Sequence, residues 1–194
     1  HGFLGQSDEE PGVEYRMATS FVKNMNHLTK KDGNILIHMH TIGGNWHDGM
    51  AIYNTIEYSP CSIAIIAYGS VSSMSSVILQ SAGIRIMMPD SEFMVHFGST
   101  AISGDSLAVI SAIDNEKRIN DRMLDIYTKR CIKGKFFRKR YKSLTFDKVK
   151  SFLTRKLKDK SDWYLSAEEA VYYGFADDII GSKKYKNTRE ARGL

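Results

Sequence analysis

The sequence predicts an α/β fold in which helices pack on a sheet, and three observations lead to it. Apolar runs of strand length alternate with stretches whose apolar residues recur at the 3.6-residue period of a helix. Residues 61–69 are almost wholly apolar, which is typical of a strand buried on both faces. A chain of 194 residues, 42% of them hydrophobic, can bury one sizeable core. We therefore expect a single domain over residues 1–194, built from repeated strand–helix units.

In the first half of the chain, helical and extended patterns alternate. Gly33 and Pro60 are expected to stop two helices, because glycine and proline interrupt a helical pattern. A serine-rich turn then separates a buried strand from the next helix. The expected elements are a helix over 13–28, a strand over 34–41, a helix over 48–59, a strand over 61–69 and a helix that opens near 74.

The second half of the chain ends in a helix with clear capping signals. Ser166 is expected to cap its N-terminus, with Glu169 completing a capping box, and Gly174 to end it before a final strand. The earlier elements are two short strands over 84–88 and 92–97 and a long amphipathic helix from about Asp105 to Tyr127.

The basic charge of the chain is concentrated in one segment. Between Lys129 and Lys160 there are fourteen Lys or Arg residues but only two Asp, whereas the whole chain has a net charge of +5. Aromatic residues lie between these charges. Aromatic residues beside cations are suited to binding single-stranded nucleic acid, and the cations alone are suited to binding an acidic partner. Those aromatic residues are Phe136, Phe137, Tyr141 and Phe146.

The same segment also fits a solvated helical pair, which is the interpretation we favour. Its second part has an apolar stripe at helical spacing beside a charged face. The stripe consists of Phe146, Val149, Phe152, Leu153 and Leu157. Nucleic acid is therefore not a partner that we expect.

No part of the sequence suggests a membrane protein. No apolar run approaches the roughly 18 to 20 residues that a membrane-spanning helix needs. The two cysteines, Cys61 and Cys131, suit a reducing compartment better than a disulfide scaffold. We expect a soluble, cytoplasmic protein without a membrane partner, and leave an organelle or a phage-infected cell open as its setting.

Three stretches could carry chemistry, although each also has an ordinary explanation. Gly43 and Gly44 follow a strand, Ser73 opens a helix, and His96 lies in an apolar strand. Taken singly, these are a turn, a cap and a core histidine. Taken together, they provide most of what acyl transfer needs, namely a nucleophile, a base and backbone N–H groups for an oxyanion.

Four stretches of the chain resemble the Clp protease proteolytic subunit (ClpP) family, and the similarity runs from about Phe3 to Ile180. The last match is the most specific, because it repeats a long pattern of spaced residues. The stretches are residues 40–56, similar to the family's Ser-Pro-Gly-Gly strand end and the following helix; 69–79, similar to its Gly-x-Ala-Ala-Ser-Met helix entrance; 89–97, similar to its Pro-Asn-Ser-x-x-Met-Ile-His strand; and 161–180, similar to its Asp-x-x-Leu-Ser-Ala ending.

The resemblance implies a serine endopeptidase that hydrolyses unfolded proteins or peptides through an acyl-enzyme. Ser73 would be the nucleophile, His96 the general base and Asp162 the group that orients His96. Backbone N–H groups of Gly44 and Met74 would form the oxyanion hole. No metal and no organic cofactor is implied.

Other polar residues near these stretches have ordinary expected roles. The pair His38 and His40 is expected to pack or hydrogen-bond rather than to bind a metal. The remaining serines of the cluster, which we expect to serve in packing and capping, are Ser70, Ser72, Ser75 and Ser76.

The resemblance also implies a fold and an assembly. The fold would be the ClpP/crotonase-like spiral of β-β-α units, with a protruding handle over about residues 98–130 made from the long helix and a neighbouring strand. Heptameric rings, stacked through the handles as a tetradecamer, would enclose the active sites. A AAA+ ATPase of the ClpX or ClpA type would deliver unfolded protein to this homo-oligomer.

Departures from the family pattern leave alternatives open. Ile42 replaces the proline before the two glycines, residues 97–100 read FGST where Gln-Pro is usual, and a basic insertion over about 131–160 precedes Asp162. The alternatives are a phage-type head-maturation peptidase that needs no ATPase and a catalytically silent scaffold subunit of the same fold. A crotonase-type acyl-CoA enzyme ranks last, because it needs no Ser-His-Asp set.

Overall fold

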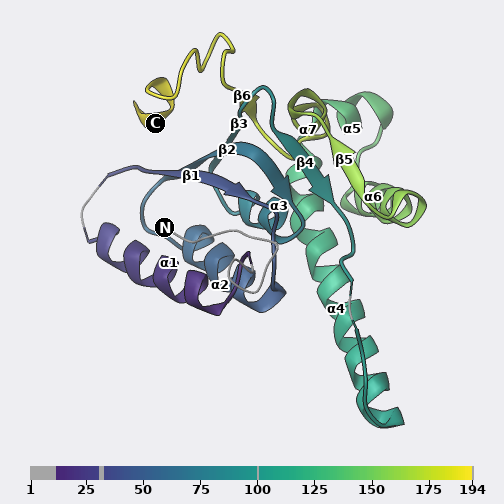
Figure 1. The fold of residues 1–194 in the computed structure, drawn as a ribbon. Coiled ribbons are helices and arrows are strands. Elements are labelled where there is room, and N and C mark those ends of the chain that lie inside the picture. The colour runs from purple at the N-terminus through teal and green to yellow at the C-terminus, as the bar shows by residue number, and fades with distance from the viewer. Residues whose placement is uncertain (1–11, 31–32, 100, 194) are drawn as a thin grey trace.

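The described part of the chain is built on one six-stranded sheet flanked by helices (Figure 1), as predicted from the alternating patterns. The computed structural model describes residues 12–30, 33–99 and 101–193. The start of the family resemblance at Phe3 lies outside these residues. The strands are β1 (Ile35–Thr41), β2 (Ile63–Ser72), β3 (Ile84–Met87), β4 (Glu92–Val95), β5 (Trp163–Leu165) and β6 (Asp178–Ile179).

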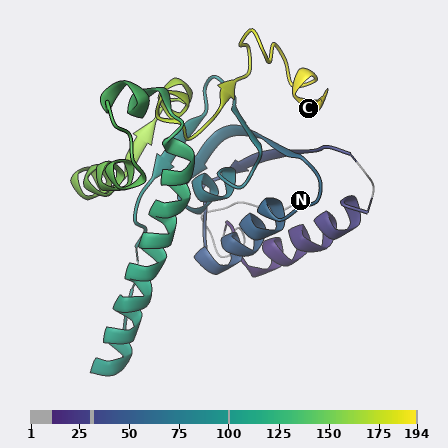
Figure 2. The ribbon, with the colours of Figure 1, turned by 180° about the vertical axis from the view of Figure 1, so that it is seen from behind.

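The helices surround the sheet unevenly. Figures 1 and 2 show α1 and α2 together on one side of the sheet, while α4 projects far beyond the rest of the molecule. A 3-10 helix, Glu190–Gly193, lies near the C-terminal end of the described chain. The α-helices are α1 (Tyr15–Leu28), α2 (Trp46–Glu57), α3 (Met74–Leu79), α4 (Ser106–Cys131), α5 (Lys135–Arg140), α6 (Phe146–Lys160) and α7 (Ala167–Tyr173).

Strand β2 organises the sheet because it pairs with three neighbours. It runs parallel to β1, to β3 over its first half and to β4 over its second half. Its side chains alternate between two cores, since successive residues of a strand point to opposite faces. Ile65 and Ala67 belong to the main core under the helices, whereas Ile66 packs with Ile86 and Tyr185 on the other face. The C-terminal segment thus covers that second face.

The capping signals in the sequence are confirmed. Ser166 accepts a hydrogen bond from the Glu169 N–H, and the Glu169 carboxylate accepts one from the Ser166 N–H, which completes the capping box of α7. Gly174 ends the helix in the left-handed region with φ of 90°. After Gly174 the chain continues into β6.

The expectation of a strand beside the long helix is wrong for the residues that the structure describes. Residues 98–99 and 101–105 contain no strand. A strand needs a hydrogen-bonding neighbour along its edge, and none of the described strands runs beside this segment. The projecting element is therefore α4 with an irregular segment leading into it.

The basic segment forms a helical pair, as favoured from the apolar stripe. Val149, Leu153 and Leu157 of α6 are buried, and the ring of Phe137 in α5 is fully buried as well. Phe137 therefore belongs to the core, and Phe136 and Tyr141 pack against it, whereas Phe146 is only half-buried and cations such as Arg138 remain exposed. Among the described residues, no helix is long and apolar enough to cross a bilayer.

Candidate active site

Ser73 lies at the turn between β2 and α3, in a backbone conformation that residues other than glycine seldom adopt. Its φ is 54° and its ψ is −125°. A residue keeps such a conformation only when its surroundings impose it, and such residues cluster at functional sites. The Ser73 N–H donates to the Met94 carbonyl of β4 at 3.0 Å, which holds the turn against the neighbouring strand.

Ser73, His96 and Asp162 form one chain of hydrogen bonds. His96 Nε2 lies 2.8 Å from Ser73 Oγ, and His96 Nδ1 lies 3.0 Å from Asp162 Oδ1. With its proton on Nδ1, the imidazole donates to Asp162 and accepts from the Ser73 hydroxyl. The His96 side chain is 23% exposed and that of Asp162 is 47% exposed, so the histidine is the better shielded of the two.

Strand β5 brings Asp162 to His96 across a long interval of sequence. It pairs antiparallel with β4, and Val95 lies opposite Trp163. The residues after Val95 and before Trp163 therefore face each other at the end of this pair. Helix α6 leads directly into β5, so the basic insertion ends where the carboxylate is placed.

The two glycines after β1 approach the serine turn so closely that a side chain would not fit. A Cβ atom added to Gly43 would lie 2.7 Å from the Ser73 Cβ and 2.8 Å from the Met74 nitrogen, and φ of Gly43 is 101°. Real Cβ atoms do not lie this close to other heavy atoms, so a side chain does not fit at Gly43. Glycine at this position thus allows the chain after β1 to lie directly against the nucleophile turn.

Gly44 and Met74 line the same cavity as Ser73. Val13 bridges this stretch by donating to the Gly43 carbonyl and accepting from the Asn45 N–H. In a parallel bridge of this kind the N–H of the middle residue, Gly44, points away from the partner. The Met74 N–H belongs to the first turn of α3, where no acceptor exists within the helix.

Ser76 and Tyr127 hold the nucleophile helix from behind. The Ser76 hydroxyl donates to the Ser73 carbonyl at 2.6 Å and lies 2.6 Å from the Tyr127 hydroxyl. Because the Ser76 proton is used toward Ser73, Tyr127 is the donor of the second bond. Burial raises the pKa of Tyr127, which keeps this donor protonated. Through Tyr127 and Ser76, helix α4 is thus linked to the backbone of Ser73, the residue just before α3.

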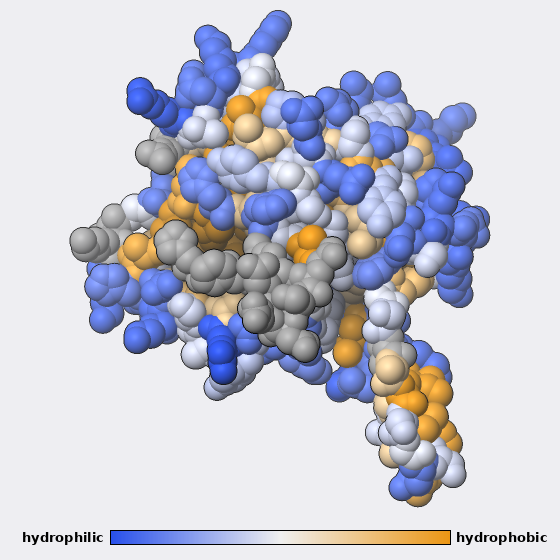
Figure 3. All heavy atoms as spheres, in the orientation of Figure 1, coloured by the Kyte–Doolittle hydropathy of each residue, from blue (hydrophilic) through white to orange (hydrophobic). Residues whose placement is uncertain are grey.

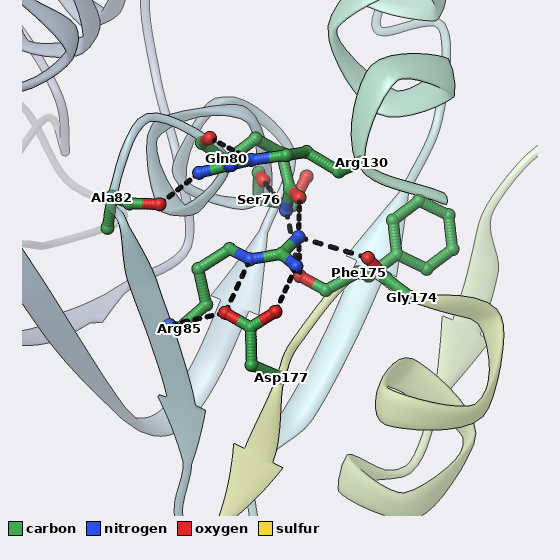
Figure 4. Close-up of polar contacts among 8 residues, drawn as sticks. All are labelled: Ser76, Gln80, Ala82, Arg85, Arg130, Gly174, Phe175 and Asp177. Atoms are coloured by element: carbon green, nitrogen blue, oxygen red, sulfur yellow. Dashed lines mark hydrogen bonds and ion pairs between the residues drawn. The ribbon is translucent and has the colours of Figure 1, made fainter. Parts of the chain in front are cut away.

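The C-terminal end of α3 is held by a network of charged side chains (Figure 4). The buried Arg85 guanidinium binds Asp177 through Nε at 3.0 Å and Nη2 at 2.5 Å, and it also donates to Gln80 Oε1 at 2.7 Å. Arg130 of α4 donates to the carbonyls of Gln80 and Ala82. Burial, and then the nearby Arg85, lower the pKa of Arg130. Both ends of the short helix are therefore fixed.

A cavity of about 470 Å³ opens beside Ser73 and His96. One wall is the turn of Gly44 and Met74 at the end of β1 and the start of α3. Another wall is a single face of α4, because its four lining residues are spaced three, four and seven positions apart. These residues are Glu116, Ile119, Asn120 and Met123.

All of the site residues expected from the sequence are found at this cavity or in hydrogen-bonded contact with it. The other serines of the cluster have structural contacts: Ser75 Oγ donates to the Thr41 carbonyl at 2.7 Å, and Ser70 Oγ lies 2.8 Å from Ser72 Oγ. His38 Nδ1 hydrogen-bonds to the Tyr68 hydroxyl at 2.7 Å. His40 Nδ1 lies 2.9 Å from the Tyr68 carbonyl oxygen.

The sequence interpretation missed the α4 wall of the cavity and the Tyr127–Ser76 contact. The spacing of the α4 residues was available as a signal, but it indicates only that they share a helix face, not that the face borders Ser73. Within the described residues, no cluster of three or more His, Cys, Asp or Glu could hold a metal ion.

The comparisons with known proteins all point to the same family. The family model described as Clp protease matches residues 10–183. An ATP-dependent Clp protease proteolytic subunit of Deinococcus radiodurans is 29% identical over 185 residues, covering 93% of this chain and 80% of the relative. The ATP-dependent Clp protease proteolytic subunit 3 of Synechococcus is 31% identical over 184 residues, covering 92% and 80%. A Streptococcus suis subunit is 28% identical over 178 residues, covering 90% and 83%.

Proposed function

We propose, from the premise that the chain belongs to the Clp protease family, that Ser73, His96 and Asp162 are the catalytic triad of this serine peptidase. The single observation that carries the proposal is the hydrogen-bonded chain from Ser73 Oγ through His96 to Asp162. A nucleophile, a base within reach of its proton and a group that orients the base are what this chemistry requires.

The reaction would proceed by acyl transfer in two steps. Ser73 Oγ attacks a peptide carbonyl while His96 Nε2 takes its proton, and Asp162 stabilises the resulting imidazolium. His96 then gives this proton to the leaving amine, and the acyl group stays on Ser73. Water attacks the acyl-enzyme, His96 takes a proton from the water, and Ser73 is regenerated as the acid product leaves.

The negative charge of each tetrahedral intermediate would be stabilised by the N–H groups of Gly44 and Met74. Both line the cavity beside Ser73, and neither N–H is used in the bridge to Val13 or inside α3. Loss of one such donor typically lowers the rate by about 10²- to 10³-fold. The tight approach of Gly43 to Ser73 would keep the two donors on the same side of the reacting carbonyl.

The proposed substrates are unfolded proteins or peptides, and the proposed assembly is a stack of two heptameric rings. The curated relatives are named as proteolytic subunits of ATP-dependent proteases, which supports a AAA+ ATPase partner for this chain. These names do not favour the phage-type peptidase or the silent scaffold. The cytoplasm is the proposed setting, because a chain with only two cysteines, Cys61 and Cys131, suits a reducing compartment better than a disulfide scaffold does.

The experiment that tests the triad is covalent labelling with a fluorophosphonate, followed by intact mass measurement and peptide mapping. We expect one label on Ser73, no label in Ser73→Ala, and labelling about 10⁴-fold slower in His96→Ala and Asp162→Asn. Ser70→Ala is the matched control, because it removes a neighbouring hydroxyl outside the triad. A label that persists in Ser73→Ala would contradict the proposal.

A further inference from the structure

The two proposed oxyanion donors belong to different segments of the chain. Gly44 lies just after the end of β1, whereas Met74 opens α3 after the turn that follows β2. Both N–H groups must point at one oxygen atom if they are to stabilise the same tetrahedral intermediate. Their separation therefore depends on how the ends of β1 and β2 are held together.

Regular strand pairing does little to align these two ends. Met39 of β1 lies opposite Ala67, but Thr41 lies opposite Val71, so β2 contains extra residues where the register shifts. The ladder is disrupted at an irregularity of this kind. Only one pair of residues in the two strands lies beyond it, which leaves the alignment of the strand ends to other contacts.

A buried serine side chain joins the two strand ends. Ser75 Oγ lies 2.7 Å from the carbonyl oxygen of Thr41, the last residue of β1, and 2.7 Å from that of Ser72, the last residue of β2. The hydroxyl carries one proton, which these two acceptors share. Ser75 is fully buried, so water would not replace these contacts if the hydroxyl were removed.

Thr41 extends this connection to the glycine pair. Thr41 is buried, and its Oγ1 accepts a hydrogen bond from the Gly43 N–H at 3.1 Å. The Gly43 carbonyl accepts one from the Val13 N–H at 2.9 Å. Both polar groups of Gly43 are thereby engaged, and its carbonyl shares a peptide plane with the Gly44 N–H. A continuous set of bonds thus runs from Ser75 through Thr41 to the Gly44 donor.

We propose that Thr41 and Ser75 are positioning residues that set the separation of the two oxyanion donors. Neither is among the described residues that line the cavity, so they act through Gly44 and Met74 and not on the substrate. The inference rests on the proposed peptidase function and extends it to the residues behind the oxyanion hole. Because the oxyanion develops only as the reaction proceeds, their loss should lower kcat and leave KM nearly unchanged.

The first test removes the hydroxyl of Ser75. The full-length native chain, Ser75→Ala and the control Ser81→Ala are compared on one fluorogenic peptide. The control deletes another buried serine hydroxyl, which donates to the Ile78 carbonyl at 2.7 Å at the other end of α3. We expect kcat to fall about 10- to 100-fold in Ser75→Ala only, because displaced donors lose part of their effect. An unchanged kcat, or an equal loss in both variants, would overturn the proposal.

Thr41 provides an independent test with a variant that restores the contact. Thr41→Val has nearly the same shape but removes the acceptor of the Gly43 N–H, whereas Thr41→Ser keeps this acceptor. We expect kcat to fall about tenfold in Thr41→Val and to recover most of this loss in Thr41→Ser. If Thr41→Ser is as slow as Thr41→Val, the methyl group and not the hydroxyl is needed, and the proposed role of Thr41 is wrong.

Inhibition by a peptide boronate provides a readout that a merely structural role would not move. The boron atom bonds to the serine oxygen and becomes tetrahedral and negatively charged, so the adduct resembles the intermediate. Its inhibition constant should rise in Ser75→Ala and Thr41→Val by about the factor by which kcat falls. Equally tight inhibition of native and variant chains would overturn the positioning role. Failure of the fluorophosphonate to label Ser73 in the native chain would instead overturn the peptidase function itself.

Discussion

At the scale of single residues, the position of Ser73 is imposed by its neighbours. Its φ of 54° is unfavourable for a residue with a Cβ atom, and Gly43 leaves no free space on one side of it. From the other side, the Ser73 carbonyl accepts the hydroxyl proton of Ser76, which is held by Tyr127. The proposed nucleophile is therefore fixed through its backbone as well as through His96.

Tyr127→Phe should loosen this support without touching the cavity. The variant removes the donor to Ser76 inside the core and should lower the free energy of unfolding by about 1 to 2 kcal/mol. We expect the labelling rate of Ser73 by a fluorophosphonate to fall severalfold while KM for a peptide changes little. Tyr53→Phe, which removes a hydroxyl from another buried tyrosine, is the control. An unchanged labelling rate would show that the Ser76–Tyr127 contact does not position Ser73.

At the scale of elements, the basic insertion acts as a brace between α4 and β5. Rings of α5 and α6 pack with those of α7, for example Phe136 against Tyr173 with centroids 4.6 Å apart. Lys150 of α6 reaches α4, where its Nζ lies 2.6 Å from Asp121 Oδ1 and 2.7 Å from Asp125 Oδ1. The insertion thereby joins the base of the projecting helix to the strand that presents Asp162.

Lys150→Met should lower the free energy of unfolding by about 1 kcal/mol. The loss is small because both carboxylates are partly exposed and solvent screens the two ion pairs. Partial burial lowers the pKa of Lys150, but hydrogen bonds to Asp121 and Asp125 outweigh this effect and raise the pKa above its ordinary value. Because the folded pKa is the higher one, the stabilisation is complete at neutral pH and is lost as pH rises through that raised pKa.

Thermal unfolding at low and high salt measures this effect. The melting temperature of Lys150→Met should be lower than that of the native chain, and the difference should shrink in high salt. Lys158→Met serves as the control, because Lys158 is an exposed lysine of the same helix. An equal loss in both variants would mean that the charge of α6, and not the contact with α4, stabilises the fold.

At the scale of the whole molecule, α4 carries apolar residues far from any core. Leu107 is 79% exposed, Ile110 is 56% exposed and Ile113 is 41% exposed. Figure 3 shows apolar side chains gathered on this projecting part. Exposed apolar patches of this kind mark interaction sites, which supports pairing of handles between the two proposed rings.

The double variant Leu107→Asp and Ile110→Asp should separate the rings. Desolvating two carboxylates in an apolar interface is costly, so we expect the assembly mass from light scattering to fall by about half. Asn115→Asp is the matched control, because it adds a negative charge on a different face of α4. A full-size assembly for the double variant would place the ring contact elsewhere.

The order of the main elements could be predicted because apolar periodicity is a local property. The runs at β1 and β2, the long pattern of α4 and the capping box at Ser166 each occupy one stretch of chain. Choosing Ser73 and His96 from several serines and six histidines required the family resemblance in addition. The site thus follows from local motifs whose order along the chain is characteristic.

Only the tertiary structure decided which distant segments meet. Strand β5 has three residues, too few to show a period, yet its pairing with β4 brings Asp162 to His96. Glu116 has the sequence context of any surface glutamate on a helix until α4 passes beside Ser73. Such contacts depend on strand register and helix crossing, which join residues far apart in sequence and leave no local pattern.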